Sequence, residues 1–228
     1  MSRQLEYYLS EINKKTRELA DMSTSAFIDA MQAFKDLDQE LAAEVRQRSS
    51  EIEEHAQGIE ENVFETIARR QPVAKDLREL ATYLQVSHHL YRVGRYAYKI
   101  AHITRLCEGM EHFKELISLP HLADLAKQTI DFAMKGVLDK DLSGIAELEE
   151  LEAESDKETS EMFEEITEYL RKRNDITTMA MYYMIVGRYC ERAADHAFSI
   201  AERAVFMVTG ERTKLGIAYK GKSSHAPH

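Results

Sequence analysis

The chain has 228 residues, a formal net charge of −10 and 31% charged residues, which is enough for one sizeable domain or two small ones. The acidic balance argues against nucleic acid as the main partner, because phosphate backbones are bound by clustered Lys and Arg. No run approaches about 18 apolar residues, so no membrane-spanning helix is predicted, and the first residues show no secretory signal. Two cysteines are too few for a disulfide framework, and we expect a cytoplasmic protein.

The first segment carries a seam with a seven-residue period, which is typical of a helix that packs along its whole length. No segment alternates in the way that a strand does. The sequence therefore predicts an all-α fold of six long helices, over residues 3–36, 38–70, 73–108, 121–137, 142–172 and 175–210. The seam consists of Leu5, Leu9, Ile12, Thr16, Leu19, Ser23, Ala26, Ala30, Ala33 and Leu37.

Residues at the junctions fit helix ends. Pro72 suits the first turn of the third helix, where a missing N–H costs nothing. Asp175 is the predicted N-cap of the last helix, and Gly210 is its predicted stop. Short polar connections at 139–141 and 171–174 favour antiparallel neighbours.

An internal repeat relates residues 80–104 to residues 180–204 at an offset of 100. A rival offset of 93 aligns the two copies of VGRY but adds little else over the same window. We predict two tandem three-helix repeats, 1–108 and 109–213, followed by a flexible basic tail, 214–228. The identities at the preferred offset are Tyr83/Tyr183, Val86/Val186, Arg92/Arg192, Ala97/Ala197, Ile100/Ile200 and Ala101/Ala201.

Two acids, Glu191 and Asp195, lie one turn apart at one margin of the apolar face of the last helix. Like charges at this spacing repel each other. One interpretation is a solvated edge on which Arg188 and Arg192 neutralise the acids. The other is a metal site of oxygen donors, which suit magnesium, manganese, calcium or iron.

Catalysis lacks support in the sequence, and we predict that the chain is not an enzyme. The Glu-x-x-His pairs of di-iron bundles, HExxH, CxxC pairs and EF-hand loops are all missing. The segment GIAYKGKS, 216–223, fits the P-loop pattern but has no strand before it and no room for a helix after it. A carboxylate-bridged metal enzyme would need an acid–base residue, and His196, the one candidate, lies on the wrong side of the helix.

Two segments carry a family resemblance. RYCERAADHAFSIAERAVFMVTGE, 188–211, resembles the helix of PhoU-family proteins with the pattern Leu-Glu-Arg-Ile-Gly-Asp-His-Ala, which runs here from Cys190 to Ala197. ARRQPVAKDLRELATYL, 68–84, is similar to the family's turn into the third helix of its first repeat. The resemblance covers essentially the whole chain.

The resemblance implies a regulator of inorganic phosphate uptake that acts by docking at the cytoplasmic face of the membrane. Its implied partners are the ATPase of a phosphate ABC transporter and a phosphate-sensing histidine kinase, and it is peripheral to the membrane through these partners only. A homodimer is compatible with this role. The nearest alternative is an accessory subunit of a low-affinity, ion-coupled phosphate transporter, and another is a metal-free helical adaptor.

The resemblance also implies metal ligands. Family members bind multinuclear clusters through Glu-x-x-x-Asp on the third helix of a repeat and an Asp on the second. In the second repeat this implies that Asp156, Glu191 and Asp195 hold divalent or trivalent ions, with iron, manganese and magnesium as candidates. Glu152 and Glu202 are lesser candidates for the same site.

The first repeat departs from the family pattern at every matching ligand position. Tyr91 replaces the Glu, Arg95 replaces the Asp, and Ser49 replaces the second-helix Asp, while Glu53 survives one turn away. We therefore expect one cluster, in the second repeat only. Our hypothesis is that the Arg95 guanidinium takes the place of the cation and pairs with Glu53.

Overall fold

The computed structural model describes residues 3–216, which form six α-helices, one short 3-10 turn at Ser143–Ile145 and no strand. The all-α prediction is confirmed. Of the predicted tail, only Lys214, Leu215 and Gly216 are described; the rest of it, and with it most of the P-loop-like segment, lies outside the described residues. The helices are α1 (Arg3–Asp36), α2 (Gln39–Arg70), α3 (Ala74–Leu106), α4 (Ser118–Leu138), α5 (Glu147–Lys172) and α6 (Thr177–Thr209).

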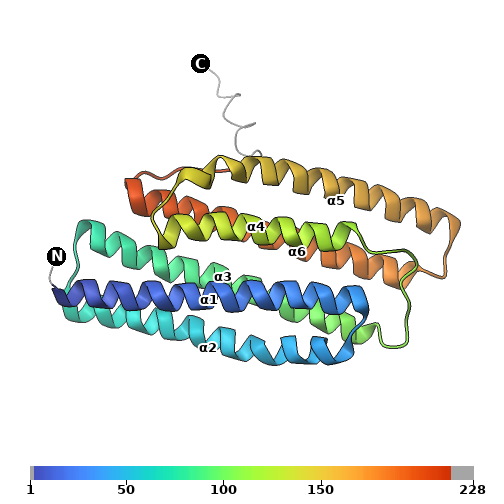
Figure 1. Cartoon of the computed structure of the whole chain (residues 1–228), viewed down its shortest axis with the longest axis horizontal. Coiled ribbons are helices and arrows are strands. Elements are labelled where there is room, and N and C mark those ends of the chain that lie inside the picture. Colours follow the sequence, from blue (N-terminus) through green and yellow to red (C-terminus); the bar gives the residue numbers. More distant parts are fainter. Residues whose placement is uncertain (1–2, 217–228) are drawn as a thin grey trace, which may run out of the picture.

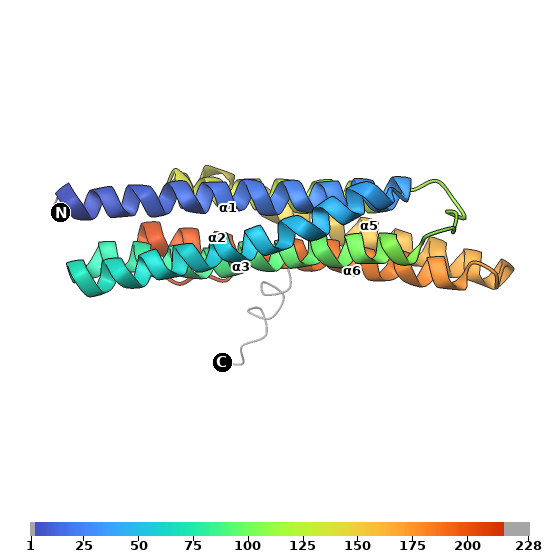
Figure 2. The same ribbon diagram turned by 90° about the horizontal axis from the view of Figure 1, so that it is seen from below.

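The six helices form two three-helix bundles that lie side by side along one long axis (Figure 1). The bundle α1–α3 makes the lower half of that view, and α4–α6 makes the upper half. Figure 2 shows that all six helices run roughly along the same axis, as expected for bundles with short loops. Contacts of α3 with α6 and of α1 with α4 join the two bundles. None of the helices in residues 3–216 combines the length and apolarity that a membrane crossing requires.

The predicted seam of α1 is buried from Leu5 to Ala33, and only its last member, Leu37, is partly exposed. Two polar residues, Thr16 and Ser23, lie in this seam with no exposed surface. The Thr16 hydroxyl donates a hydrogen bond to the Ile12 carbonyl at 2.8 Å, which satisfies it within the helix. The seven-residue period therefore identified the face of α1 that packs against its neighbours.

Two helix ends have residues that commonly cap helices, and a third helix end does not use its predicted cap. Asp38 caps α2 by accepting hydrogen bonds from the backbone N–H groups of Glu40 and Leu41. Gly210 ends α6 in the left-handed conformation, at φ +83°, as predicted. The predicted cap at Asp175 is wrong: α6 begins two residues later, and the Asp175 carboxylate pairs with the Arg173 guanidinium instead.

The two prolines within residues 3–216 lie at or just before helix starts, and Pro72 is outside the first turn in which it was predicted. Pro72 precedes α3, which begins at Ala74, one residue later than predicted. The fourth helix begins at Ser118 rather than at residue 121, so Pro120 lies within its first turn, where its lack of a backbone N–H breaks no intrahelical hydrogen bond.

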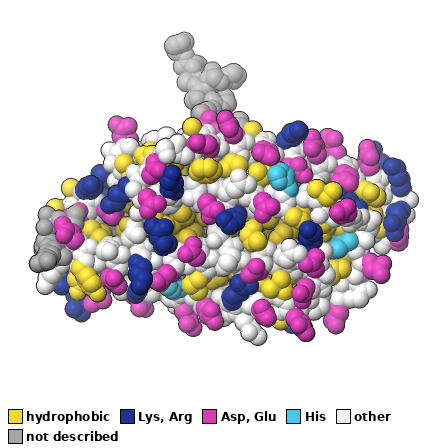
Figure 3. All heavy atoms as spheres, viewed as in Figure 1, with side chains coloured by type: hydrophobic (Ala, Val, Ile, Leu, Met, Phe, Trp, Pro, Cys, Tyr) yellow, Lys and Arg dark blue, Asp and Glu magenta, His cyan; other side chains and the backbone are white. Residues whose placement is uncertain are grey.

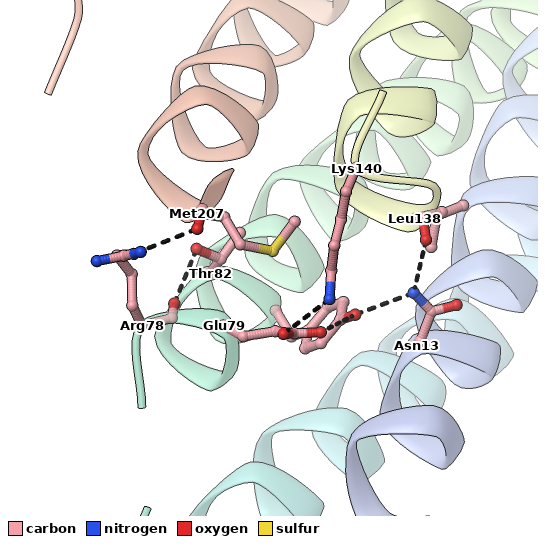
Figure 4. A network of polar contacts seen from close by, with 8 residues as sticks. Asn13, Arg78, Glu79, Thr82, Leu138, Lys140 and Met207 are labelled. Atoms are coloured by element: carbon pink, nitrogen blue, oxygen red, sulfur yellow. Dashed lines mark hydrogen bonds and ion pairs between the residues drawn. The ribbon is translucent and has the colours of Figure 1, made fainter. Parts of the chain in front are cut away.

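A buried polar network joins the two bundles at one end (Figure 4). Glu79 on α3 is 5% exposed, and its carboxylate accepts from the Lys140 ammonium at 3.0 Å and from the Tyr83 hydroxyl at 3.2 Å. On α1, the Asn13 amide donates to the Tyr83 hydroxyl at 2.9 Å and to the Leu138 carbonyl at 3.1 Å. Helices α1 and α3 and the end of α4 thus meet around one buried carboxylate.

Replacing Lys140 with Met should destabilise the fold, because it leaves the buried Glu79 carboxylate without its cation. We expect a loss of about 1–3 kcal/mol in the free energy of unfolding, measured by urea denaturation. The matched control is Lys127→Met on α4, whose partner Asp131 is exposed, and it should cost less than about 0.5 kcal/mol. Equal losses in the two variants would contradict this role of the network.

Candidate metal centre

The fifth helix is the most acidic segment of the chain, with a net charge close to that of the whole chain, −10. Residues 147–172 contain ten glutamates and one aspartate against two lysines and one arginine, a net charge of −8. Acidic side chains recur along the upper edge of the molecule, over α5 (Figure 3). Only Leu148, Met162 and Ile166 of this helix are buried. A thin apolar seam therefore holds α5 in place against the repulsion among its own acids.

Helices α5 and α6 make a tight contact one turn before the acidic pair. A β-carbon on Gly187 would lie 2.6 Å from the terminal methyl of Met162, so the glycine is what lets this side chain reach the surface of α6. Cys190 and Ala193, which follow on α6, are buried. Small residues on α6 thus allow α5 to lie beside the margin that carries Glu191 and Asp195.

The structure brings the three predicted ligands into electrostatic range of one another. Partial desolvation raises the pKa of the Asp195 carboxyl, and repulsion from Glu191 and Asp156 adds to the rise. Arg188 and Arg192 oppose this shift. Arg188 forms an ion pair with Glu191, whereas Arg192 forms none with the residues that the structure describes. Asp195 therefore lies in the electrostatic field of acids on both α5 and α6, and burial is the largest cause of its raised pKa.

The donor set fits a hard cation, since all three groups are carboxylates from two adjacent helices. No group of three or more His, Cys, Asp or Glu side chains within residues 3–216 lies close enough together to hold an ion. The lesser candidate Glu202 is engaged elsewhere, because it accepts hydrogen bonds from the Lys214 ammonium and the Leu215 N–H, both at 3.1 Å. The metal site at Asp156, Glu191 and Asp195 stays a prediction.

The corresponding place in the first repeat is filled by protein side chains. The Arg95 guanidinium donates to the Ser49 hydroxyl at 3.4 Å and lies over the ring of Tyr98. The Tyr91 hydroxyl donates to the Glu53 carboxylate at 3.5 Å. The hypothesised pair of Arg95 with Glu53 is wrong, because the described residues show no ion pair between them. A guanidinium does link α2 and α3 here, through Ser49 and not through the acid.

His196 faces away from the acidic pair and toward the first bundle. Its Nδ1 lies 2.9 Å from Nδ1 of His89, and its Nε2 lies 3.1 Å from the Tyr96 hydroxyl. Burial and the positive charges nearby lower the pKa of both imidazoles to about 4. Both ring nitrogens of His196 are thus occupied by α3. No pattern in the sequence indicates this contact, because the two histidines are 107 residues apart.

The architecture defines the class of protein: a tandem pair of related three-helix bundles that pack through their third helices. Within this class, residues 16–104 and 119–204 each match the family model described as the PhoU domain. The two matches together cover more than half of the chain, and the protein belongs to the PhoU family.

Curated relatives match nearly the whole chain. The "Phosphate-specific transport system accessory protein PhoU homolog 1" of Methanothermobacter thermautotrophicus is 25% identical over 205 residues, which are 90% of this chain and 94% of the relative. The protein of the same name from Thermotoga maritima is 27% identical over 187 residues, 82% of this chain and 81% of the relative.

Two solved structures share the fold. The crystal structure of PhoU from Pseudomonas aeruginosa superimposes with a TM-score of 0.85 at 24% identity, covering 90% of this chain and 99% of that one. The phosphate transport system regulatory protein PhoU from Streptococcus pneumoniae gives a TM-score of 0.82 at 19% identity, covering 92% of this chain and all of that one. At these identities the likeness establishes the fold alone.

The raised pKa of Asp195 predicts how its replacement changes stability. The folded state holds the Asp195 proton more tightly than the unfolded chain does, so stability falls as the pH rises through the raised pKa and stays lower at neutral pH. Asp195→Asn should therefore raise the melting temperature at about pH 7 in the presence of a chelator, and give no gain at about pH 3. Asp131→Asn, which removes an exposed carboxylate paired with Lys127, serves as the control and should give no gain at either pH.

Proposed function

We propose that this protein is a regulator of inorganic phosphate uptake that acts in the cytoplasm by docking on a phosphate transporter, on a phosphate-sensing histidine kinase, or on both. The observation that carries the proposal is the match of both repeats to the PhoU domain model. Curated relatives that align over at least four-fifths of this chain are named as accessory proteins of phosphate-specific transport systems. A pair of long bundles with a largely exposed α5 offers surface for docking, and we assign the protein no catalytic step.

We further propose that Asp156, Glu191 and Asp195 hold one or more divalent or trivalent cations, with iron, manganese and magnesium as candidates. When bound, the ion would supply the positive charge that offsets the mutual repulsion of these carboxylates. Two contacts within the chain position the proposed ligands. Arg188 orients Glu191 through their ion pair, and the contact of Met162 with Gly187 sets α5 beside α6.

Metal analysis of purified protein tests the site. We expect the wild type to carry metal and Asp195→Ala to lose most of it, because removing one of three carboxylates from so small a donor set leaves too few ligands. Glu53→Ala is the matched control, since it removes the surviving acid of the first repeat, and it should keep the wild-type content. Equal loss in both variants, or equal occupancy of both repeats, would contradict a single site in the second repeat.

Stability separates the metal-binding regulator from a metal-free adaptor. The double variant Glu191→Ala, Asp195→Ala should lose the thermal stabilisation that added metal gives to the wild type. If metal content and melting temperature are the same in the wild type and the double variant, the metal proposal fails and the adaptor is favoured.

Capture of membrane partners tests the docking function. Tagged protein should retain the ATPase of a phosphate ABC transporter or a phosphate-sensing kinase from detergent-solubilised membranes of its own host. Retention of an ion-coupled phosphate transporter in place of both would instead support the accessory-subunit alternative. Retention of none of the three under phosphate-rich and phosphate-poor growth would overturn the docking function.

A further inference from the structure

A small pocket lies where the chain leaves α6 and folds back along it. Gly210 ends the helix in a left-handed conformation and turns the chain. The following segment is then held against α6 by Glu202, which accepts from the backbone N–H of Leu215 and from the ammonium of Lys214. The resulting cavity has a volume of about 100 Å³ and is lined by Glu202, Arg203, Phe206, Arg212, Thr213 and Lys214.

The lining is positively charged, in a chain whose net charge is −10. Three cations line the pocket against one acid, and that acid is already bonded to Lys214. Arg203 and Arg212 form no ion pair with the residues that the structure describes. The charge of Arg203 also lowers the pKa of His89, so its positive field extends to the neighbouring helix. The pocket therefore offers two guanidinium groups that have no ion-pair partner within residues 3–216.

An aromatic ring supports one of these groups. The Arg212 guanidinium lies over the ring of Phe206, 5.1 Å from its centre, and Arg78 of α3 lies over the same ring at 5.8 Å. Arg78 also donates to the Met207 carbonyl at 3.2 Å, as the close-up of this end of the molecule shows (Figure 4). Stacking on a ring leaves the N–H donors at the edge of a guanidinium available for a ligand. Arg78, which does not line the pocket, thus adds a fourth cation to its positive potential from outside.

We propose that this pocket binds a tetrahedral oxyanion of the phosphate type, held by Arg203 and Arg212 with the hydroxyl of Thr213 as a further hydrogen-bonding group. Guanidinium groups match phosphate oxygens in geometry and charge. A volume of about 100 Å³ is that of roughly three liquid waters, which is the scale of one such anion. The proposed ligand is either free phosphate or the phosphoryl group of a larger molecule.

The anion pocket is separate from the candidate metal centre and goes beyond the docking function. Arg203 follows Asp195 by eight residues, or about 12 Å of helix. The proposed ligand of the pocket is an anion, whereas the proposed ligand of Asp156, Glu191 and Asp195 is a cation. Binding by the purified chain, with no partner present, tests it without reference to either earlier proposal.

Isothermal titration of the full chain with inorganic phosphate provides the test, in a low-salt buffer with a chelator that prevents binding through a metal ion. We expect saturable binding, weakened about tenfold or more in Arg203→Ala and in Arg212→Ala. Arg203→Lys keeps the positive charge but loses the paired N–H donors of the guanidinium. Its affinity for phosphate should therefore lie between that of the alanine variants and that of the wild type. Arg69→Ala removes an exposed cation of α2 paired with Glu65 and should bind like the wild type.

Two further arms complete the experiment. Glycerol phosphate in place of inorganic phosphate identifies the source: tighter binding of the ester indicates a phosphoryl group on a larger molecule, and tighter binding of phosphate indicates the free anion. Circular dichroism and melting curves confirm that each variant is folded. The proposal is overturned if the wild type shows no saturable binding of either compound, or if Arg203→Ala and Arg212→Ala bind as tightly as Arg69→Ala.

Discussion

The third helices of the two bundles, α3 and α6, pack against each other in opposite directions, and the positions of all the sites depend on this contact. The order of contacts shows its direction: Arg78 meets Met207, His89 meets His196, and Tyr96 stacks on Tyr189. Because one side of α6 is buried against α3 and α4, its remaining margin is left for α5. That margin carries Glu191 and Asp195, which is why the acidic pair faces the most acidic helix of the chain.

Charge is separated along α6. Its middle part adds two carboxylates to the negative potential of α5, while the pocket beyond its end is lined mainly by cations. Arg203 and Arg212 form no ion pair among residues 3–216, and the same is true of Arg192 and several other arginines. Like charges held close together oppose folding, and a ligand of the opposite charge, bound as proposed, would offset this repulsion.

The two repeats keep the same packing and differ in their charged sites. Tyr83 and Tyr183 occupy matching positions in the internal repeat, and both are almost fully buried. The Tyr83 hydroxyl is hydrogen-bonded to Asn13 of α1, and the Tyr183 hydroxyl to His112 in the loop before α4. At the ligand positions, in contrast, the first repeat has a guanidinium and two hydroxyl groups in place of carboxylates. The first bundle thus contains a positive charge at the place where the second carries acids, of which Glu191 is paired with Arg188.

The sequence by itself determined what depends on neighbours within a few turns: the six helices, the buried seam of α1, the glycine end of α6 and the internal repeat. It did not determine side-chain partners. Asp175 had an arginine two residues away that competed for its carboxylate, and Arg95 had a serine and an aromatic ring within reach. The pair of His89 with His196 and the cationic pocket at the end of α6 were decided by tertiary structure alone. Periodicity predicts which face of a helix is buried, but not which helix packs against that face or where the chain turns back. Those contacts form only when segments distant in the sequence pack together.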